Sequence, residues 1–286
     1  MGRVTLAGRV ALVTGASRGV GKGVVLGLAE AGATVYFTGR SVRGEAASVP
    51  LGGTIEDTAE EAQALGGEAI PIRCDHRHDD EVRAVFDRIR AERGRLDVLV
   101  NNAWAGYEYL HRGEYQHLGA PFWTRPLSLW DDMFAGGVRT QYVGSGLAAP
   151  LLIEGGGGLI VHISSFASMR SDGDVALGVA KGATDRLAAE TVGELREHNV
   201  AVVSLYPGLV RTESVVAAAE GGFIDLSNSE SPQFVGRAVA ALAADPNVLE
   251  RTGQVLVVAE VAEEYGFTDV DGATPQSLRG HYEPRE

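Results

Sequence analysis

The sequence is short of several residue types, and each shortage limits what the protein can be. Among 286 residues there is one cysteine, Cys74, so no disulfide can form within the chain, and a reducing compartment is the simplest expectation. No apolar run approaches the ~18 residues of a membrane-spanning helix. The N-terminus enters a strand pattern without the charged and apolar leader of a signal peptide. We therefore expect a cytoplasmic protein without a membrane partner.

Basic residues are also scarce. The chain has 25 lysine and arginine residues against 38 aspartate and glutamate residues, a formal net charge of −13. Such an excess of negative charge argues against nucleic acid or an anionic membrane as the main partner. It does not exclude a nucleotide, because backbone N–H groups and a few arginines can hold phosphate locally. We expect a small-molecule substrate and no nucleic acid.

Short apolar runs alternate with amphipathic stretches along nearly the whole chain. Runs rich in valine, isoleucine and leucine are typical of strands buried on both faces of a parallel sheet. The pattern predicts an α/β fold over residues 1–286, a single Rossmann-type doubly wound parallel sheet of strand order 3-2-1-4-5-6-7 with helices on both faces. The expected strands are 10–14, 34–38, 69–73, 96–100, 159–164, 200–206 and 255–258, and the expected helices are 21–31, 54–65, 79–92, 127–152, 175–198 and 231–244.

Three irregular stretches, 41–53, 104–125 and 212–230, each follow the carboxyl end of an expected strand. Ligands bind at that edge of a doubly wound sheet, so we expect 104–125 and 212–230 to form the substrate pocket. The first of these two is dense in aromatic residues, which suit an apolar or aromatic substrate but equally suit a cover for the sheet edge or a subunit contact. They are Trp104, Tyr107, Tyr109, Tyr115, Phe122 and Trp123, with Trp130 following.

A glycine-rich loop follows the first strand and opens a helix. Its glycines, Gly15, Gly19 and Gly21, allow a tight turn that brings the backbone close to a pyrophosphate at a helix N-terminus. Ser17 and Arg18 lie between them. A ligand-free turn would be an alternative, but the position between strand and helix favours a dinucleotide.

The spacing of this loop resembles that of the short-chain dehydrogenase/reductase superfamily, and further motifs follow in the family's order over about residues 5–260. They are Asp75 after the third strand, Asn101-Asn102-Ala103 after the fourth, Ser164-Ser165 after the fifth, Lys181 on the next helix, and Pro207-Gly208 with Thr212 after the sixth. Trp104 stands where the family has a glycine. The resemblance implies that the cofactor is bound by Gly15, Ser17, Arg18, Gly19, Gly21, Arg40, Asp75, Asn101, Lys181, Pro207, Gly208 and Thr212.

The end of the second strand bears on the choice of cofactor. An acidic residue there would bond the ribose 2′-hydroxyl and repel a 2′-phosphate. This chain has Arg40-Ser41, with Arg18 and Arg43 nearby, and a guanidinium suits a phosphate. We expect NADP(H), with NAD(H) possible. The alternative is that Arg40 is only a solvated strand end.

The resemblance also implies a catalytic serine, Ser165, and a lysine, Lys181. The family's proton-donating tyrosine would stand four residues before the lysine, where this chain has Leu177. Its proton-relay asparagine would fall near Gly137, so that residue is also absent. Losing a positioned general acid typically costs about 10²–10⁴ in rate.

Three functions remain open. The first is an oxidoreductase in which another group donates the proton, with Tyr107, Tyr109, His111, Tyr115 and Tyr206 as candidates, although each is more typical of packing. The second is a non-redox enzyme that performs cyclisation or elimination. The third is a catalytically silent cofactor-binding protein.

Two further patterns are weaker. Cys74, His76 and His78 are more typical of a solvated turn than of a metal site, and we expect no metal. His162, within a strand, is expected to be a satisfied interior residue. The family resemblance also implies a homodimer or homotetramer built through the helices at 127–152 and 175–198.

Overall fold

The computed structural model describes residues 4–45, 51–106, 108, 119–170, 174–222 and 224–282. A seven-stranded parallel sheet forms its centre, in the order β3-β2-β1-β4-β5-β6-β9. The expected strand order is confirmed, and β9 is its seventh strand because two short strands, β7 (Leu209–Val210) and β8 (Ser229–Glu230), pair separately. The other strands are β1 (Val10–Val13), β2 (Thr34–Gly39), β3 (Glu68–Arg73), β4 (Val98–Asn101), β5 (Gly158–Ile163), β6 (Val200–Tyr206) and β9 (Val255–Val257).

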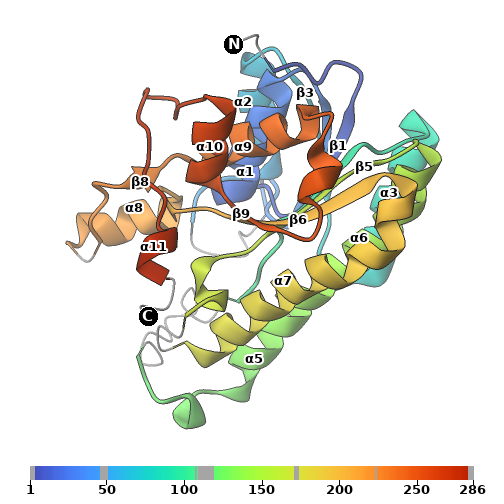
Figure 1. The fold of residues 1–286 in the computed structure, drawn as a ribbon. Helices are drawn as coiled ribbons and strands as arrows, with labels where there is room; N and C mark the ends of the chain where they lie inside the picture. Colours follow the sequence, from blue (N-terminus) through green and yellow to red (C-terminus); the bar gives the residue numbers. More distant parts are fainter. Residues whose placement is uncertain are drawn as a thin grey trace.

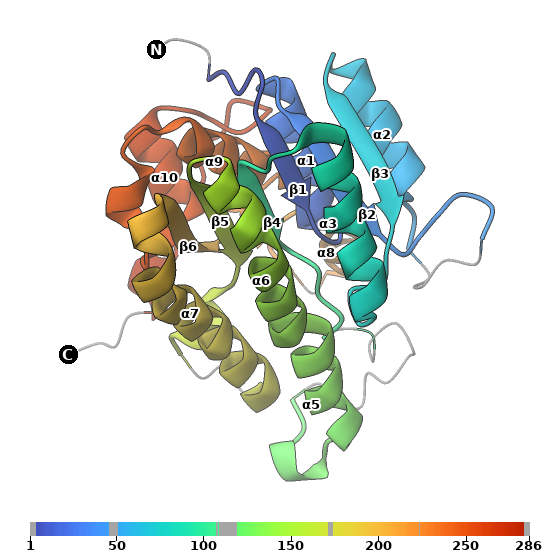
Figure 2. The same cartoon turned by 90° about the vertical axis from the view of Figure 1, so that its right-hand side faces the viewer.

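Helices cover both faces of the sheet (Figure 1). One face carries α1 (Gly19–Glu30), α2 (Ile55–Ala64), α9 (Pro232–Ala244) and α10 (Val258–Tyr265), packed on an apolar core that alternate strand residues supply. Figure 2 shows α3 (Asp79–Arg93), α6 (Arg139–Glu154) and α7 (Val175–Leu195) across the other face. Strands that bury side chains on both faces therefore read as nearly continuous apolar runs, as the sequence does.

The long helix expected at 127–152 consists of three segments. α5 (Leu127–Met133) passes through a π-helical turn, η3 (Phe134–Val138), into α6. Such turns often mark functional sites. Gly136 and Gly137 are buried in it, and Gly136 O accepts a hydrogen bond from Ala105 N at 3.0 Å. The turn therefore lies against the chain that leaves β4.

Part of the stretch expected to be irregular at 212–230 is helical. α8 (Glu213–Glu220) begins after Thr212, whose hydroxyl accepts a hydrogen bond from Val215 N. Serine and threonine are preferred at the N-cap of a helix, so Thr212 is a sequence signal for the start of α8. The remaining short elements are η2 (Phe122–Thr124), η4 (Phe166–Ser168), η5 (Arg196–His198), η6 (Val248–Arg251) and α11 (Arg279–Tyr282). None of the helices within the described ranges is long and apolar enough to cross a membrane.

Candidate active site

The glycine-rich loop between β1 and α1 packs directly against the chain that follows β4. A Cβ at Gly15, where φ is +70°, would lie 2.7 Å from Ala103 Cα. One at Gly21 would lie 2.3 Å from Gly15 O and 2.4 Å from Asn102 Nδ2. Any larger residue would push the loop away from β4, so these two glycines set its shape.

Asn102 holds the loop in place. Its Nδ2 donates to Thr14 O at 2.9 Å and to Gly15 O at 2.7 Å, while Thr14 Oγ1 accepts from the backbone of Asn102 and Ala103. Sequence reasoning assigned the cofactor role to its neighbour Asn101 instead. The Asn101 side chain is buried and donates to Ser145 Oγ at 3.0 Å, beneath α6, so only its backbone is placed to reach a ligand at the sheet edge.

Two arginines lie at the carboxyl end of β2. Arg18 donates from Nη2 to Ser41 Oγ at 2.8 Å and to Gly53 O at 2.9 Å. Burial lowers the pKa of Arg18, the Glu213 carboxylate opposes that shift, and the Arg40 charge adds to it. The two guanidinium groups are therefore close enough to repel each other, and an anion between them would relieve that repulsion.

Arg40 itself lies between carboxylates. Its Nη2 is 2.5 Å from Glu108 Oε1, and its Nη1 is 3.9 Å from Asp75 Oδ2. The third arginine expected here, Arg43, turns away toward α2 and pairs with the carboxylates of Asp57 and Glu60. Arg40 is therefore not a freely solvated strand end.

Asp75 lies beside these arginines, as expected from its place after β3. Burial acts to raise the pKa of its carboxyl, but hydrogen bonds from Arg77 and the nearby Arg40 charge outweigh burial and hold it at about 2. The neighbouring residues correct the expectation of a solvated turn, because Cys74 and His76 are both buried. His76 Nε2 lies 2.7 Å from Thr38 Oγ1, and burial lowers the pKa of this histidine to about 4.

Lys181 reaches the end of β5, and Ser165 lies two residues beyond that strand. Lys181 projects from α7, is 8% exposed, and donates from Nζ to Ile163 O at 3.2 Å. Burial lowers the pKa of Lys181 to about 8, against the opposing charge of Asp185. Ser165 is half-buried and directly precedes η4. The fold thus brings the predicted serine and lysine to one edge of the sheet.

One side of the Lys181 ammonium is covered by an indole. The Lys181 ammonium lies 3.9 Å from the centroid of a Trp104 ring. Trp104 packs with Leu177 in one apolar cluster, and a Cβ at Gly137 would lie 2.4 Å from Trp104 Cζ3. Trp104, Gly137 and Leu177, at which the sequence analysis expects departures from the family pattern, therefore lie in one region: the Trp104 ring occupies the room beside Gly137 and packs against the cluster that contains Leu177.

Tyr206, a candidate proton donor, is fully buried at the end of β6. Its hydroxyl donates to Asp185 and is bonded to Ser168. Burial and the Asp185 carboxylate both raise the pKa of Tyr206. A phenol whose proton is already held by a carboxylate is a poor acid. His162 is buried as expected, but only Nδ1 has a partner, Asn101 Nδ2 at 3.4 Å.

The other candidate donors, Tyr107, Tyr109, His111 and Tyr115, lie outside the described residues. Of the described aromatics near them, Phe122 and Trp123 are 61% and 74% exposed and meet edge to face, whereas Trp130 stacks on Phe134. The exposed pair belongs to η2, which precedes α5. Of the candidate donors, the structure therefore describes only Tyr206.

The chain after β6 passes Pro207 and Gly208 and reaches Thr212 at the start of α8. A Cβ at Gly208 would lie 2.9 Å from Oε2 of Glu230, a carboxyl that is 1% exposed. Burial is the main reason that the pKa of Glu230 is raised, to about 8, against a hydrogen bond from the Gly208 backbone. The sequence analysis did not predict a buried carboxyl at Glu230. No motif around this residue, two positions before Pro232, would have indicated one.

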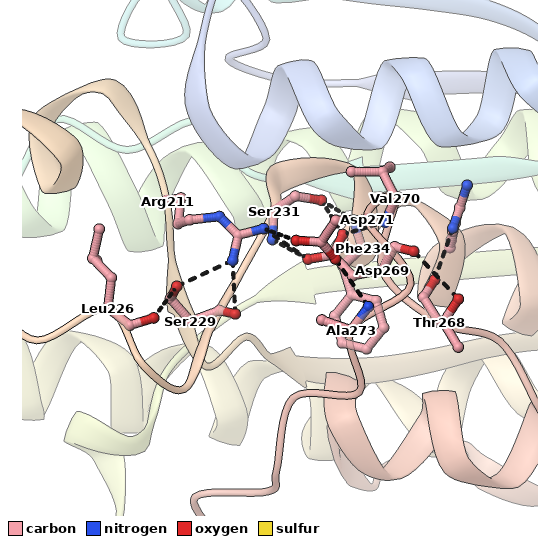
Figure 3. A network of polar contacts seen from close by, with 11 residues as sticks. Arg211, Leu226, Ser229, Ser231, Phe234, Thr268, Asp269, Val270, Asp271 and Ala273 are labelled. Atoms are coloured by element: carbon pink, nitrogen blue, oxygen red, sulfur yellow. Dashed lines mark hydrogen bonds and ion pairs between the residues drawn. The ribbon is translucent and has the colours of Figure 1, made fainter.

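A polar network ties this segment to the C-terminal part of the chain (Figure 3). Arg211 donates from Nη1 to Ser229 O at 2.9 Å and from Nη2 to Asp269 Oδ2 at 3.0 Å. Asp269 is buried and accepts from Ser231 N at 2.7 Å, while Ser231 caps α9. These contacts anchor the N-terminal end of α8 to β8 and to the C-terminal part of the chain.

A second unforeseen carboxylate reaches the glycine-rich loop itself. Glu213, the first residue of α8, accepts from Gly19 N with Oε2 at 3.0 Å. No sequence motif indicates this contact, because the two residues are 194 positions apart.

Comparisons with known proteins agree with this geometry. The family profile of short chain dehydrogenase matches residues 9–221. A mouse protein, dehydrogenase/reductase SDR family member 1, is 43% identical over 277 residues, which are 93% of this chain and 84% of the mouse protein. Together with the fold and the phosphate loop, these matches fix the family.

Solved structures agree as well. A 7α-hydroxysteroid dehydrogenase complexed with NADH and 7-oxo glycochenodeoxycholic acid superposes with a TM-score of 0.73 at 25% identity, covering 96% of this chain and 98% of that one. A Beutenbergia cavernae protein with bound NADP at low occupancy superposes with a TM-score of 0.72 at 28% identity, covering 90% and 97%. The chain belongs to the short-chain dehydrogenase/reductase family of NAD(P)-dependent oxidoreductases.

Proposed function

We propose that this protein is an atypical short-chain dehydrogenase/reductase that binds NADP(H) and reduces or oxidises a carbonyl or hydroxyl group of an apolar or aromatic small molecule. The observation that supports the phosphorylated cofactor is the pair of guanidinium groups of Arg18 and Arg40, with Ser41, at the end of β2. A 2′-phosphate would accept charge-assisted hydrogen bonds from both arginines. NAD(H) lacks the 2′-phosphate, so these two arginines would not increase its affinity.

The residues around the site fit such a cofactor. Gly15 and Gly21 let the loop pack closely against β4, and with Gly19 this loop would present the N-terminus of α1 to a pyrophosphate; Asp75 follows β3 where the adenine would lie. Lys181 would hold the ribose. Backbone groups around Asn101, Pro207 and Gly208, with Ser17 and Thr212, would complete the binding set. When bound, the cofactor supplies or accepts a hydride.

Ser165 would orient the substrate oxygen, and the substrate would lie under 104–125 and 212–230. The proton has to come from a group other than Leu177, which cannot ionise. Water held by Ser165 is one source that this chain leaves open, because Lys181 lies beneath an indole. The exposed Phe122 and Trp123 favour an apolar or aromatic substrate.

A specific observation favours the alternative, a protein that performs non-redox chemistry or is catalytically silent. Trp104 lies over Lys181, fits beside Gly137 and packs against the cluster that contains Leu177, so apolar groups surround the position where a general acid would be expected. A reductase with this arrangement would be slow by the factor that a missing acid costs, about 10²–10⁴.

We also propose a homodimer or homotetramer. A hollow between η3, α6 and α7 is lined by apolar groups and by both signs of charge, and Tyr142 is exposed in it. A second copy related by a two-fold axis could pair acidic with basic residues across it. Sedimentation velocity of wild type and Tyr142→Glu tests this assembly, which the variant should weaken.

The experiment that tests the function is single-turnover oxidation of NADPH with a panel of ketones, aldehydes and quinones. Wild type is compared with Leu177→Tyr. Turnover by wild type, with little gain in the variant, supports an oxidoreductase that uses another proton source. If wild type binds NADPH but only the variant reacts, the non-redox or silent alternative is correct.

A further inference from the structure

Glu213 satisfies a backbone donor that α1 leaves open. Its Oε2 and Oε1 lie 3.0 and 3.4 Å from the nitrogen of Gly19, the first residue of that helix. The first N–H groups of a helix have no partner within it, and the N-cap residue here, Arg18, provides no side-chain hydrogen bond. A carboxylate also interacts favourably with the positive end of the helix dipole. Glu213 thus stabilises α1 from an element far away in the sequence.

The same N–H groups are those on which the pyrophosphate of a dinucleotide would rest. A carboxylate and a phosphate cannot both accept the single Gly19 proton, and they repel each other. Glu213 is also close enough to Arg18 for its charge to raise the pKa of that guanidinium. Its carboxylate therefore lies at the N-terminus of α1, beside the charge of Arg18.

We infer that Glu213 is an intramolecular competitor for the pyrophosphate, and that binding of a nucleotide displaces its carboxylate and leaves α8 held only at its Thr212 end. This inference rests on the proposed cofactor site. The Glu213 carboxylate would then lower the affinity for the cofactor below the value that the site would have without this competitor. It also couples the nucleotide to the position of a helix in the expected substrate region.

The contacts of α8 explain why this one bond controls the helix. None of its residues is buried, so the helix is held by few contacts. Its base is fixed, because Arg211 is anchored to Ser229 and Asp269 (Figure 3). Beyond that anchor, Thr212 Cγ2 lies 3.4 Å from the position of a Cβ on Gly19, and Glu213 makes the bond described above. Loss of the Glu213 contact would free α8 while leaving the anchor intact.

The test compares Glu213→Gln with a matched control on the same helix, Glu220→Gln, whose side chain is exposed at the other end. Dissociation constants for NADPH and NADH are measured by titration calorimetry. If the competing contact is formed in about 70–90% of molecules, its loss should tighten binding of both nucleotides roughly 3- to 10-fold. The control should change neither affinity by more than about twofold.

A second measurement needs no nucleotide. Hydrogen exchange at the Gly19 amide and along α8 should be faster in Glu213→Gln than in wild type and in the control, because a neutral amide is a weaker acceptor. Unchanged exchange together with unchanged or weaker nucleotide binding would overturn the inference.

Failure of the proposed cofactor site would be recognised separately. If wild type binds neither nucleotide, that site is wrong, and inorganic pyrophosphate becomes the probe. A larger rise in melting temperature with pyrophosphate for Glu213→Gln than for wild type would still support competition at Gly19. Equal rises, or none in either protein, would refute it.

Discussion

The ammonium of Lys181 lies 3.9 Å from the centroid of a Trp104 ring, and Trp104 packs against the apolar cluster that includes Leu177. An ammonium over an indole is stabilised by the ring quadrupole, which partly offsets the loss of hydration. The contact is possible because Gly137 leaves room for the ring. A tyrosine introduced at 177 would therefore enter the cluster against which Trp104 packs.

Removing Trp104 should test whether this packed group stabilises the protein. Trp104→Ala leaves a cavity against Leu177 and Lys181, and we expect a loss of about 2–4 kcal/mol in the free energy of unfolding. Trp123→Ala is the control, because that ring is 74% exposed and should cost less than about 0.5 kcal/mol. Urea denaturation followed by circular dichroism measures both. Equal losses would show that the Trp104 ring is not integral to the core.

Lys181 should make stability depend on pH. Its pKa is lowered from 10.5 to about 8 in the folded state, so between those values the unfolded chain binds more protons and stability rises with pH. Below pH 8 the buried charge costs up to about 3 kcal/mol. Lys181→Met should therefore be more stable than wild type at pH 7, with the difference vanishing near pH 10.5.

The titration of Lys181 can also be observed directly. The chain has two lysines, Lys22 and Lys181, so Lys22→Met with ¹³C-labelled lysine leaves one NMR signal. Its midpoint should lie near pH 8. A midpoint above pH 10 would mean that the ammonium is hydrated and not covered by Trp104.

Arg40 should determine the preference for the phosphorylated cofactor. Arg40→Ala removes a charge-assisted donor worth about 1.5–3 kcal/mol, so NADPH binding should weaken roughly 10- to 100-fold. NADH binding should change little. Arg43→Ala is the control, since that arginine pairs with Asp57 and Glu60 instead. Equal losses for both nucleotides would argue against a 2′-phosphate site at Arg40.

Asp269 and Asp271 both contact Arg211, but only Asp269 is buried. Asp269→Asn should cost about 2–3 kcal/mol of stability at pH 7, because it removes the charged acceptor of a buried network. Asp271→Asn should cost less than about 0.5 kcal/mol. Chemical denaturation measures the difference, and equal effects would contradict the role given to the network.

The Asp269 network should also weaken in acid. Burial acts to raise the pKa of Asp269, but hydrogen bonds from Ser231 and Val270 and the Arg211 charge hold it below its usual range. The stabilisation is therefore complete above the unfolded pKa of about 3.9 and is lost as the pH falls through the lower folded value. The stability difference between wild type and Asp269→Asn should shrink below about pH 4.

Much of the architecture followed from the sequence alone. Apolar runs such as the one that became β6 (Val200–Tyr206) are typical of strands buried on both faces, and their alternation with helical stretches predicts a doubly wound parallel sheet. The tight loop at Gly15 and Gly21 could also be predicted, because only glycine permits such close approach of backbone to backbone. Ser165 and Lys181 reached one sheet edge because parallel strands end together.

The contacts that define the site were decided only by tertiary structure. The sequence showed what was missing at Leu177 and Gly137, but not that Trp104 fills their place above Lys181. It gave no sign that Glu213 would reach Gly19, because the two residues are 194 positions apart. Local patterns determine which face of a strand or helix is buried. Which side chains then meet across the sheet edge depends on how distant segments pack, and no local pattern encodes it.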